Sequence, residues 1–193
     1  INQLMTMPLS GICQGGQPLI SYNFGAGKTE RVKEAFRCVF AVCVGYAAIF
    51  WLALMFVPQA FAGIFTSDEN LVKYTVWAMR IFLACGFSVG FQLSCQQSFM
   101  ALGQAKVSLL LACLRKLILL IPLIYILPLF FTGQDKIFAV FLAEPISDLI
   151  AAAVTSITFF VQFKKILKRG MIAVQIADNI SHIVLFPFIF SML

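Results

Sequence analysis

Charged residues are scarce in this sequence. Asp, Glu, Lys and Arg together make up 11% of its 193 residues, while hydrophobic residues make up 61%. A soluble domain carries roughly 25% charged residues, so this chain has too little polar surface to cover a globule in water. The composition excludes an ordinary soluble domain and indicates a protein whose natural solvent is lipid.

Residue patterns that hold metals or perform catalysis are also missing. The six cysteines lie in apolar stretches without a C-x-x-C pair, and the single histidine, His182, is far from them along the chain. Neither a zinc site nor a disulfide framework is predicted, and the cysteines are interpreted as small buried hydrophobes. No catalytic triad, H-E-x-x-H or dinucleotide motif occurs, and residues 25–29 (GAGKT) lack the spacing of a phosphate-binding loop. We therefore predict no enzyme, no metal and no cofactor.

What the sequence does contain is a series of long apolar stretches, each close to the 20 residues that a membrane helix needs. They predict an all-α, polytopic membrane helix bundle with about five transmembrane helices. The predicted spans lie near residues 1–25, 35–58, 74–102, 108–131 and 137–163. Glycines at 25 and 27 are expected to end the first span, and residues 132–135 to form the turn between the last two.

The basic residues give these spans a direction. Of the 14 Lys and Arg residues, four follow the first span, three the third and four the fifth, while the remaining three lie on the other side. The positive-inside rule then places the eleven in the cytoplasm, with residue 1 outside and the C-terminal side cytoplasmic. The net charge of +6 is explained by this orientation, so no nucleic-acid partner is predicted.

Both ends of the chain are atypical. An outside start without a signal peptide predicts a missing preceding span, so the chain is interpreted as a piece of something longer. Residues 169–193 carry polar groups near their middle, and the apolar run after them is too short to cross a bilayer. This tail is expected to be interfacial or disordered and not a sixth span.

Four segments, in order and at similar intervals, carry a resemblance to a known family. They are residues 15–27 (GGQPLISYNFGAG) with the loop KTERVK after them, residues 98–105 (SFMALGQA), 114–122 (LRKLILLIP) and 143–148 (AEPISD). These resemble the C-terminal lobe of a multidrug and toxic compound extrusion (MATE) transporter, and the version closest to them is that of the MepA-like bacterial branch. The resemblance covers residues 1–168, while the lobe's first helix and the whole N-terminal lobe have no counterpart.

The resemblance implies a secondary active transporter that exports cationic amphiphilic drugs by antiport against H⁺ or Na⁺. Its expected partners are the lipid bilayer, small organic cations and the missing N-terminal lobe, and its expected location is a bacterial inner membrane. In some branches of the family an acid in the third span binds the coupling ion. The third span of this chain has no such acid, so the coupling acid is expected in the missing lobe. Two alternatives are a lipid-linked oligosaccharide flippase of the same superfamily and an inactive fragment or assembly partner.

Polar side chains within the spans are candidates for the substrate cavity. An unpaired amide in hydrocarbon is costly, so these side chains should face protein or a wet cavity. The amides at issue are Gln14, Gln17, Asn23, Gln92 and Gln96. They are interpreted either as cavity lining or as interhelical hydrogen bonding, which is common in bundles.

Backbone features of the spans have a similar double interpretation. Pro18 removes a backbone donor inside the first span and is either a hinge for alternating access or a static kink. Gly11-x-x-x-Gly15 and Gly86-x-x-x-Gly90 fit the close-packing motif of membrane helices.

The intramembrane charges are the most specific signal. Glu144 and Asp148 are four residues apart on one helix face, so they repel each other unless a proton or a cation is nearby. A rise of about 1.5 Å per residue brings Arg115 to nearly the depth of Asp148, and we predict that these two form a pair. That pair either belongs to a proton relay or cation site or is a structural lock of the lobe. Arg115, Glu144 and Asp148 complete the predicted site.

Overall fold

The computed structural model describes residues 2–64, 68–130 and 135–190. Within these ranges the chain is helical and contains no strand, which confirms the predicted all-α class. The elements in order are α1 (Asn2–Gly25), α2 (Thr29–Phe56), α3 (Pro58–Gly63), α4 (Glu69–Phe82), α5 (Ser88–Ala101), α6 (Ala105–Cys113), the π-helix η1 (Leu114–Leu120), α7 (Ile121–Ile126), the 3₁₀-helix η2 (Leu127–Leu129) and α8 (Asp135–Phe190).

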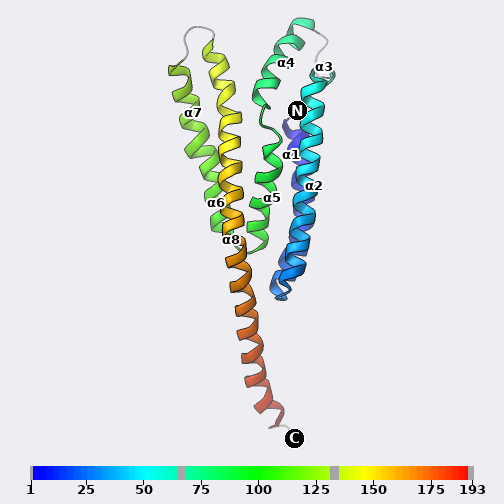
Figure 1. Ribbon diagram of the computed structural model, residues 1–193, viewed down its shortest axis with the longest axis vertical. Coiled ribbons are helices and arrows are strands. Elements are labelled where there is room, and N and C mark those ends of the chain that lie inside the picture. Colours follow the sequence, from blue (N-terminus) through cyan, green and yellow to red (C-terminus); the bar gives the residue numbers. More distant parts are fainter. Residues whose placement is uncertain (1, 65–67, 131–134, 191–193) are drawn as a thin grey trace.

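The helices form an elongated bundle in which two groups meet (Figure 1). Helices α1, α2 and α5 pack against one another, and the continuous rod from α6 to η2 lies along α8. Helix α8 joins the two groups because it also packs against α4 and α5. Its C-terminal part runs on beyond the ends of the other helices (Figure 1).

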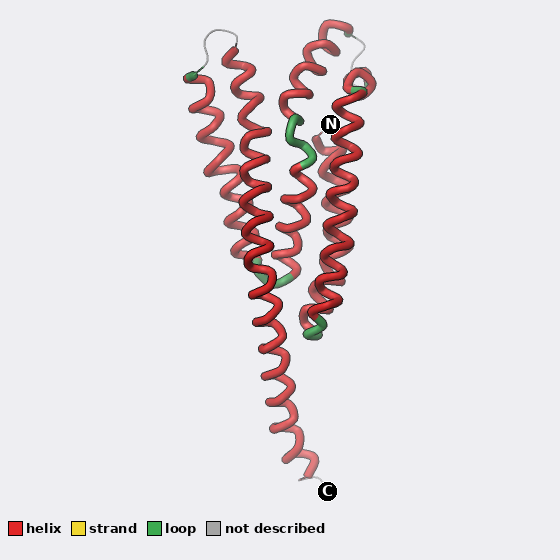
Figure 2. The backbone as a smooth tube through the Cα atoms, in the orientation of Figure 1, coloured by secondary structure: helices red, strands yellow, loops and turns green. Residues whose placement is uncertain are grey.

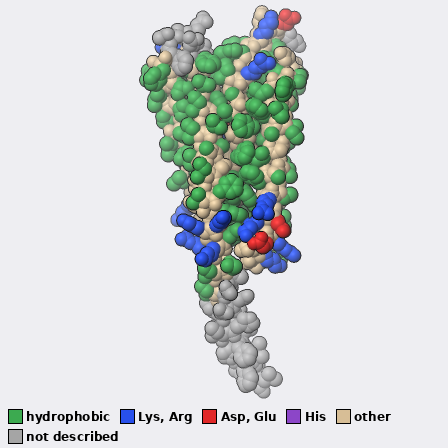
Figure 3. Space-filling view, viewed as in Figure 1, with side chains coloured by type: hydrophobic (Ala, Val, Ile, Leu, Met, Phe, Trp, Pro, Cys, Tyr) green, Lys and Arg blue, Asp and Glu red, His purple; other side chains and the backbone are tan. Residues whose placement is uncertain are grey.

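The surface of this bundle is that of a membrane protein. Three helical stretches, Thr29–Phe56, Ala105–Leu129 and Phe138–Ile172, are long and apolar enough to cross a bilayer. Large apolar side chains such as Ile49, Phe56 and Ile157 are more than 60% exposed, which is favourable only in contact with lipid. Figure 3 shows hydrophobic side chains covering the middle of the body, with Lys and Arg gathered toward its ends.

Of the other two predicted spans, one is a single helix as expected and one is not. Residues 1–25 do form one helix, α1, of 24 residues. The span predicted over residues 74–102 is instead two helices of 14 residues each, α4 and α5, separated by a turn at residues 83–87 (Figure 2). Each is too short to cross a bilayer alone, so only the two in succession reach the expected length.

The turn between α4 and α5 is stabilised from α2. Its backbone makes tight i to i+3 bonds, such as Gly86 N–H to the carbonyl of Leu83 at 3.0 Å, which frees carbonyls from the helical pattern. The indole Nε1–H of Trp51 donates to the carbonyls of Leu83 and Ala84 at 3.0 and 3.1 Å. Irregular backbone is tolerated at membrane depth where the protein itself supplies the missing partners, and Trp51 does so here.

Two glycines end helices at the same end of the bundle. Gly27 and Gly103 are the positive-φ residues of the described chain, at 69° and 75°. After each, a backbone N–H reaches back to the carbonyl five residues earlier, from Lys28 to Asn23 at 2.9 Å and from Gln104 to Phe99 at 2.8 Å. This is the Schellman arrangement, which favours glycine. The predicted end of the first span is confirmed, since α1 ends at Gly25.

The two glycine motifs behave differently. A Cβ at Gly90 would lie 2.8 Å from the Cβ of Ala47 and 2.9 Å from the carbonyl of Cys43, so α5 and α2 approach closely there. A Cβ at Gly11 or Gly15 would meet nothing within 4 Å. Close packing is therefore observed at Gly90 but not at Gly11 or Gly15, although α1 as a whole packs against α2 and α5.

The tail continues the last helix. The backbone of α8 stays helical from Asp135 to Phe190 without a break after residue 168. Residues 191–193 of the tail lie outside the described residues, as do residues 132–134 of the predicted turn. The interfacial position predicted for residues 169–193 stays a prediction.

Candidate functional site

The centre of the candidate site is an ion pair between η1 and α8. The Nε and Nη2 atoms of Arg115 both lie 2.6 Å from Oδ1 of Asp148. This confirms the pair that the sequence predicts. Asp148 is 8% exposed, so its charge depends on the guanidinium for compensation.

A second acid and a second base extend this pair into a cluster. Oε1 of Glu144 lies 3.7 Å from Nη2 of Arg115 and 3.6 Å from Nζ of Lys116. We call the four residues Arg115, Lys116, Glu144 and Asp148 the charge cluster. It holds two acids and two bases, so the two carboxylates on one face of α8 are offset by cations from the neighbouring helix.

The charge cluster lies well inside the predicted span. Arg115 is ten residues from the start of α6 and Asp148 thirteen from the start of α8. At a rise of about 1.5 Å per residue these are roughly 15 and 20 Å from opposite ends of the two helices. In a hydrocarbon core of about 30 Å both residues are far from water. Ionisable residues at such depth are expensive and usually functional.

The backbone at the cluster is irregular, which sets the direction of its side chains. Residues of η1 follow a π-helical pattern in which Ile121 N–H bonds to the carbonyl of Lys116, five residues earlier. Pro122 follows directly and has no N–H of its own, so an α-helical bond there is impossible. Ser147 Oγ donates to the carbonyl of Arg115 at 3.1 Å, which ties α8 to this segment. Single π turns are frequent at functional sites.

The glutamines of α5 have separate environments. Gln92 is 3% exposed, and its Oε1 has no hydrogen-bond partner within the described chain. Gln96 Nε2 approaches the carbonyl of Ser108 at 3.5 Å, and Ser108 Oγ donates to the carbonyl of Gln96 at 3.2 Å. Gln96 therefore joins α5 to α6, as the interhelical interpretation expects. Gln92 is buried between helices with spare hydrogen-bonding capacity.

The candidates on α1 do not join the charge cluster. Gln14 is exposed and Gln17 is half-buried. Asn23 is buried, and its Nδ2 donates to the carbonyl of Leu19 at 2.8 Å, one turn earlier in the same helix. Pro18 lies inside α1, which continues as a helix past it. The chain thus assembles three of the predicted site residues, Arg115, Glu144 and Asp148, into one cluster, and places the amides elsewhere.

Two members of this region are absent from the residues chosen from the sequence. Lys116 pairs with Glu144 although its side chain is 58% exposed, and Ser147 bonds to the η1 backbone. Helical spacing gives a signal for Ser147, since it lies three residues after Glu144 and beside Asp148. Lys116 has no such signal. Adjacent residues of an α-helix point about 100° apart, so an α-helical pattern would not place Lys116 on the same face as Arg115, but η1 is not α-helical.

Comparison with known proteins gives consistent relatives. The MatE family model matches residues 1–126. The chain is 26% identical over 149 residues to the multidrug export protein MepA of Staphylococcus aureus (strain N315), covering 77% of this chain and 33% of the relative. It is 24% identical over 149 residues to MepA of Staphylococcus saprophyticus, with the same coverage. The chain thus spans about a third of the length of the curated relatives it matches, 33% of each.

Solved structures agree on the fold. A structure of the MATE multidrug transporter DinF-BH is similar with a TM-score of 0.74 and 32% identity, covering 82% of this chain and 35% of that one. An inward-facing MATE family transporter is similar with a TM-score of 0.76 at 18% identity, covering 86% and 38%. An outward-facing one gives 0.75 at 17%, covering 86% and 37%. These relatives are transporters, in agreement with the interpretation that the sequence is not that of an enzyme.

Proposed function

The chain belongs to the MatE family, and from this premise we propose that it forms most of one lobe of an efflux transporter. In this proposal residues 1–168 are a partial C-terminal lobe in a bacterial inner membrane, with the C-terminal side in the cytoplasm. The substrates are cationic amphiphilic compounds, and the driving force is antiport against H⁺ or Na⁺. The missing N-terminal lobe would complete the transporter.

The observation that carries the proposal is the charge cluster. Its two carboxylates, Glu144 and Asp148, are held in the membrane by ion pairs with Arg115 and Lys116. A proton, a sodium ion or a cationic substrate that reaches a carboxylate competes with the bases for it. Protonation of Asp148 would remove one charge of the pair and free Arg115, and such a change in pairing can couple an ion to a movement of helices.

A second observation supports a lobe that moves as a unit. The chain resembles an inward-facing and an outward-facing family member equally well, with TM-scores of 0.76 and 0.75. The fold of this region is therefore compatible with both states. Alternating access is then a movement of one lobe against another and not a refolding of either.

The flippase alternative is less well supported. It requires a strongly cationic cavity to which Arg115 and Lys116 both contribute. In the structure each base faces a carboxylate, and the described cluster holds as many acids as bases. The neutral balance of the cluster suits a site for a cation or a proton better than one for an anionic lipid-linked sugar.

The proposal is tested by efflux of a fluorescent organic cation from cells that express this chain with its preceding region restored, and from cells that express the chain alone. We expect export from the restored protein, and a decrease of about tenfold or more in Asp148→Asn, as expected when a buried charged interaction is lost. Glu30→Gln is the matched control, because Glu30 is an exposed acid whose ion pair in the described part of the chain is with Lys33, and it should export normally.

Two outcomes would change the assignment. Export by the chain alone would mean that two copies assemble the second lobe. Absence of export by the restored protein, at normal expression, would remove the drug-efflux proposal and favour the flippase or the inactive fragment.

A further inference from the structure

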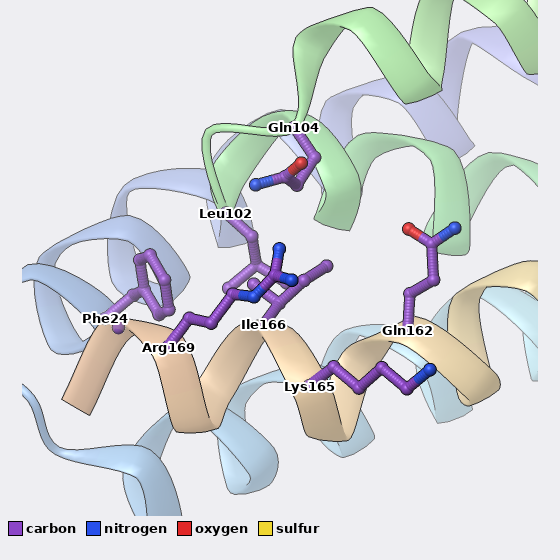
Figure 4. A pocket seen from close by; sticks show the side chains of 8 residues that line it. Phe24, Leu102, Gln104, Gln162, Lys165, Ile166 and Arg169 are labelled. Carbon is purple, nitrogen blue, oxygen red and sulfur yellow. The ribbon is translucent and has the colours of Figure 1, made fainter. Parts of the chain in front are cut away.

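A pocket of about 560 Å³ lies at the basic end of the bundle. It is lined by the end of α1, the turn between α5 and α6, and α8 (Figure 4). The side chains that define its character are Phe24, Leu102, Gln104, Gln162, Lys165 and Arg169. We call it the basic-end pocket.

The polar side of the pocket is positively charged. Lys165 and Arg169 are four residues apart, so they share one face of α8. No acid lines the pocket, and within the described ranges no ion pair joins either side chain to a carboxylate. Gln104 and Gln162 add two amide groups that can donate hydrogen bonds. In Figure 4 the guanidinium of Arg169 extends from α8 toward Gln104.

The other side of the pocket is apolar and closely packed. A Cβ at Gly170 would lie 2.5 Å from Cε2 of Phe24, so only glycine lets this ring rest against α8. Leu102 and Ile166 are 2% and 8% exposed and complete the apolar wall. The Schellman turn at Gly103 holds Gln104 at the rim. The pocket is therefore built by three separate chain segments, each fixed by its own packing.

The position of the pocket selects an amphiphilic ligand. Lys and Arg side chains gather at this end of the body, directly below its hydrophobic surface (Figure 3). The site has cations and amides on one side and apolar groups on the other, and it lies at the boundary of the hydrocarbon. These features match a lipid whose charged headgroup binds in the site and whose acyl chains lie in the adjacent leaflet. We propose that the basic-end pocket binds the phosphate of an anionic phospholipid headgroup.

Within this site Arg169 would hold the phosphate oxygens in bidentate fashion, with Lys165 as a second cation. The two amides would donate to the remaining oxygens of the headgroup. Phe24 and Leu102 would contact its glycerol part. This proposal concerns the stability and lipid surroundings of the protein, and it does not depend on which compound the transporter moves.

The test uses the full protein that contains this chain, purified in detergent and titrated with phosphatidylglycerol or phosphatidylcholine while bound lipid is counted by native mass spectrometry. We expect phosphatidylglycerol to bind preferentially, and the double variant Lys165→Gln, Arg169→Gln to lower that affinity by about tenfold or more. Inorganic phosphate is added in a separate titration as a soluble competitor. It should compete only weakly, because it lacks the apolar part.

The matched control removes the same charge from the same turns of α8. Lys164 and Lys168 line a different, smaller pocket with Thr29 and Lys33. The variant Lys164→Gln, Lys168→Gln should therefore change the affinity by no more than about threefold, as expected for exposed charges that do not touch the headgroup. Gln162→Leu keeps the charge and should still weaken binding. Three outcomes would each overturn the proposal. They are an equal loss of affinity in both double variants, equal binding of phosphatidylcholine and phosphatidylglycerol, and inorganic phosphate that competes as strongly as the lipid does.

Discussion

At the scale of single residues, the pair of Arg115 and Asp148 has both a structural and a transport interpretation. The acid is 8% exposed, and both contacts from the guanidinium measure 2.6 Å. A buried pair of this kind adds little net stability compared with apolar residues, but the loss of one partner leaves a charge without compensation. Single and double substitutions therefore distinguish the two interpretations.

The first prediction uses that difference. Arg115→Leu leaves Asp148 uncompensated in the membrane and should lower the free energy of unfolding by about 3 kcal/mol. Arg115→Leu combined with Asp148→Leu should recover most of this loss, because both charges are gone. Unfolding of the full protein in detergent measures both. If the double variant regains stability but not dye export, the pair acts in transport. If it regains both, the pair is only a structural lock.

At the scale of elements, the break between α4 and α5 is the clearest departure from a regular bundle. The carbonyls of Leu83 and Ala84 at this break both accept a hydrogen bond from the indole of Trp51 on α2. A Cβ at Gly86 would lie 3.2 Å from Cδ1 of the same indole, so glycine lets the ring approach. The element boundary thus depends on a side chain more than 30 residues earlier in the chain, as the separations of 32 and 33 show.

The second prediction tests that dependence. In the parent protein, Phe87 packs edge-on against the indole of Trp51. Trp51→Phe keeps an aromatic ring at this position but removes the N–H donor. The carbonyls of Leu83 and Ala84 then both lose the indole donor, and within the described chain that of Leu83 keeps only the N–H of Gly86. This should lower the free energy of unfolding by about 1–3 kcal/mol and speed hydrogen exchange at residues 83–88. Trp77→Phe serves as the control, because Trp77 is 41% exposed, and it should change stability by less than about 0.5 kcal/mol. A Trp51→Phe variant as stable as the parent would contradict this role.

At the scale of the whole molecule, the charge distribution gives the bundle two different ends. Lys and Arg gather at the end where α1 and α5 stop and from which α8 emerges (Figure 3). The opposite end carries few of them, among which are Lys73 and Arg80 on α4. The positive-inside rule relates this asymmetry to the direction of insertion.

The third prediction concerns this orientation. In a variant without the six native cysteines, a single cysteine is placed at Asn70 or at Thr29, near opposite ends of the bundle. A maleimide that cannot cross membranes, added to whole cells, should label Asn70→Cys but not Thr29→Cys, and disruption of the cells should expose both. Labelling of Thr29→Cys in intact cells would reverse the topology.

The sequence by itself determined the membrane character, the helical class and the pairing of Arg115 with Asp148. The reason is that these depend on composition, on the length needed to cross lipid, and on a helical rise of about 1.5 Å per residue. All three can be evaluated along a single chain. The family was also accessible, since its motifs are local segments in a fixed order.

The tertiary structure decided what depends on contacts between distant residues. The break at residues 83–87 depends on Trp51, the close approach at Gly90 on Ala47, and the basic-end pocket on three segments that meet only in the folded chain. The same applies to Gln96, whose partner Ser108 lies on the next helix. It applies also to Gly15, which fits a packing motif although an added Cβ there would meet no described atom within 4 Å. Periodicity shows which residues share a face, but the packing of neighbouring helices determines what that face meets.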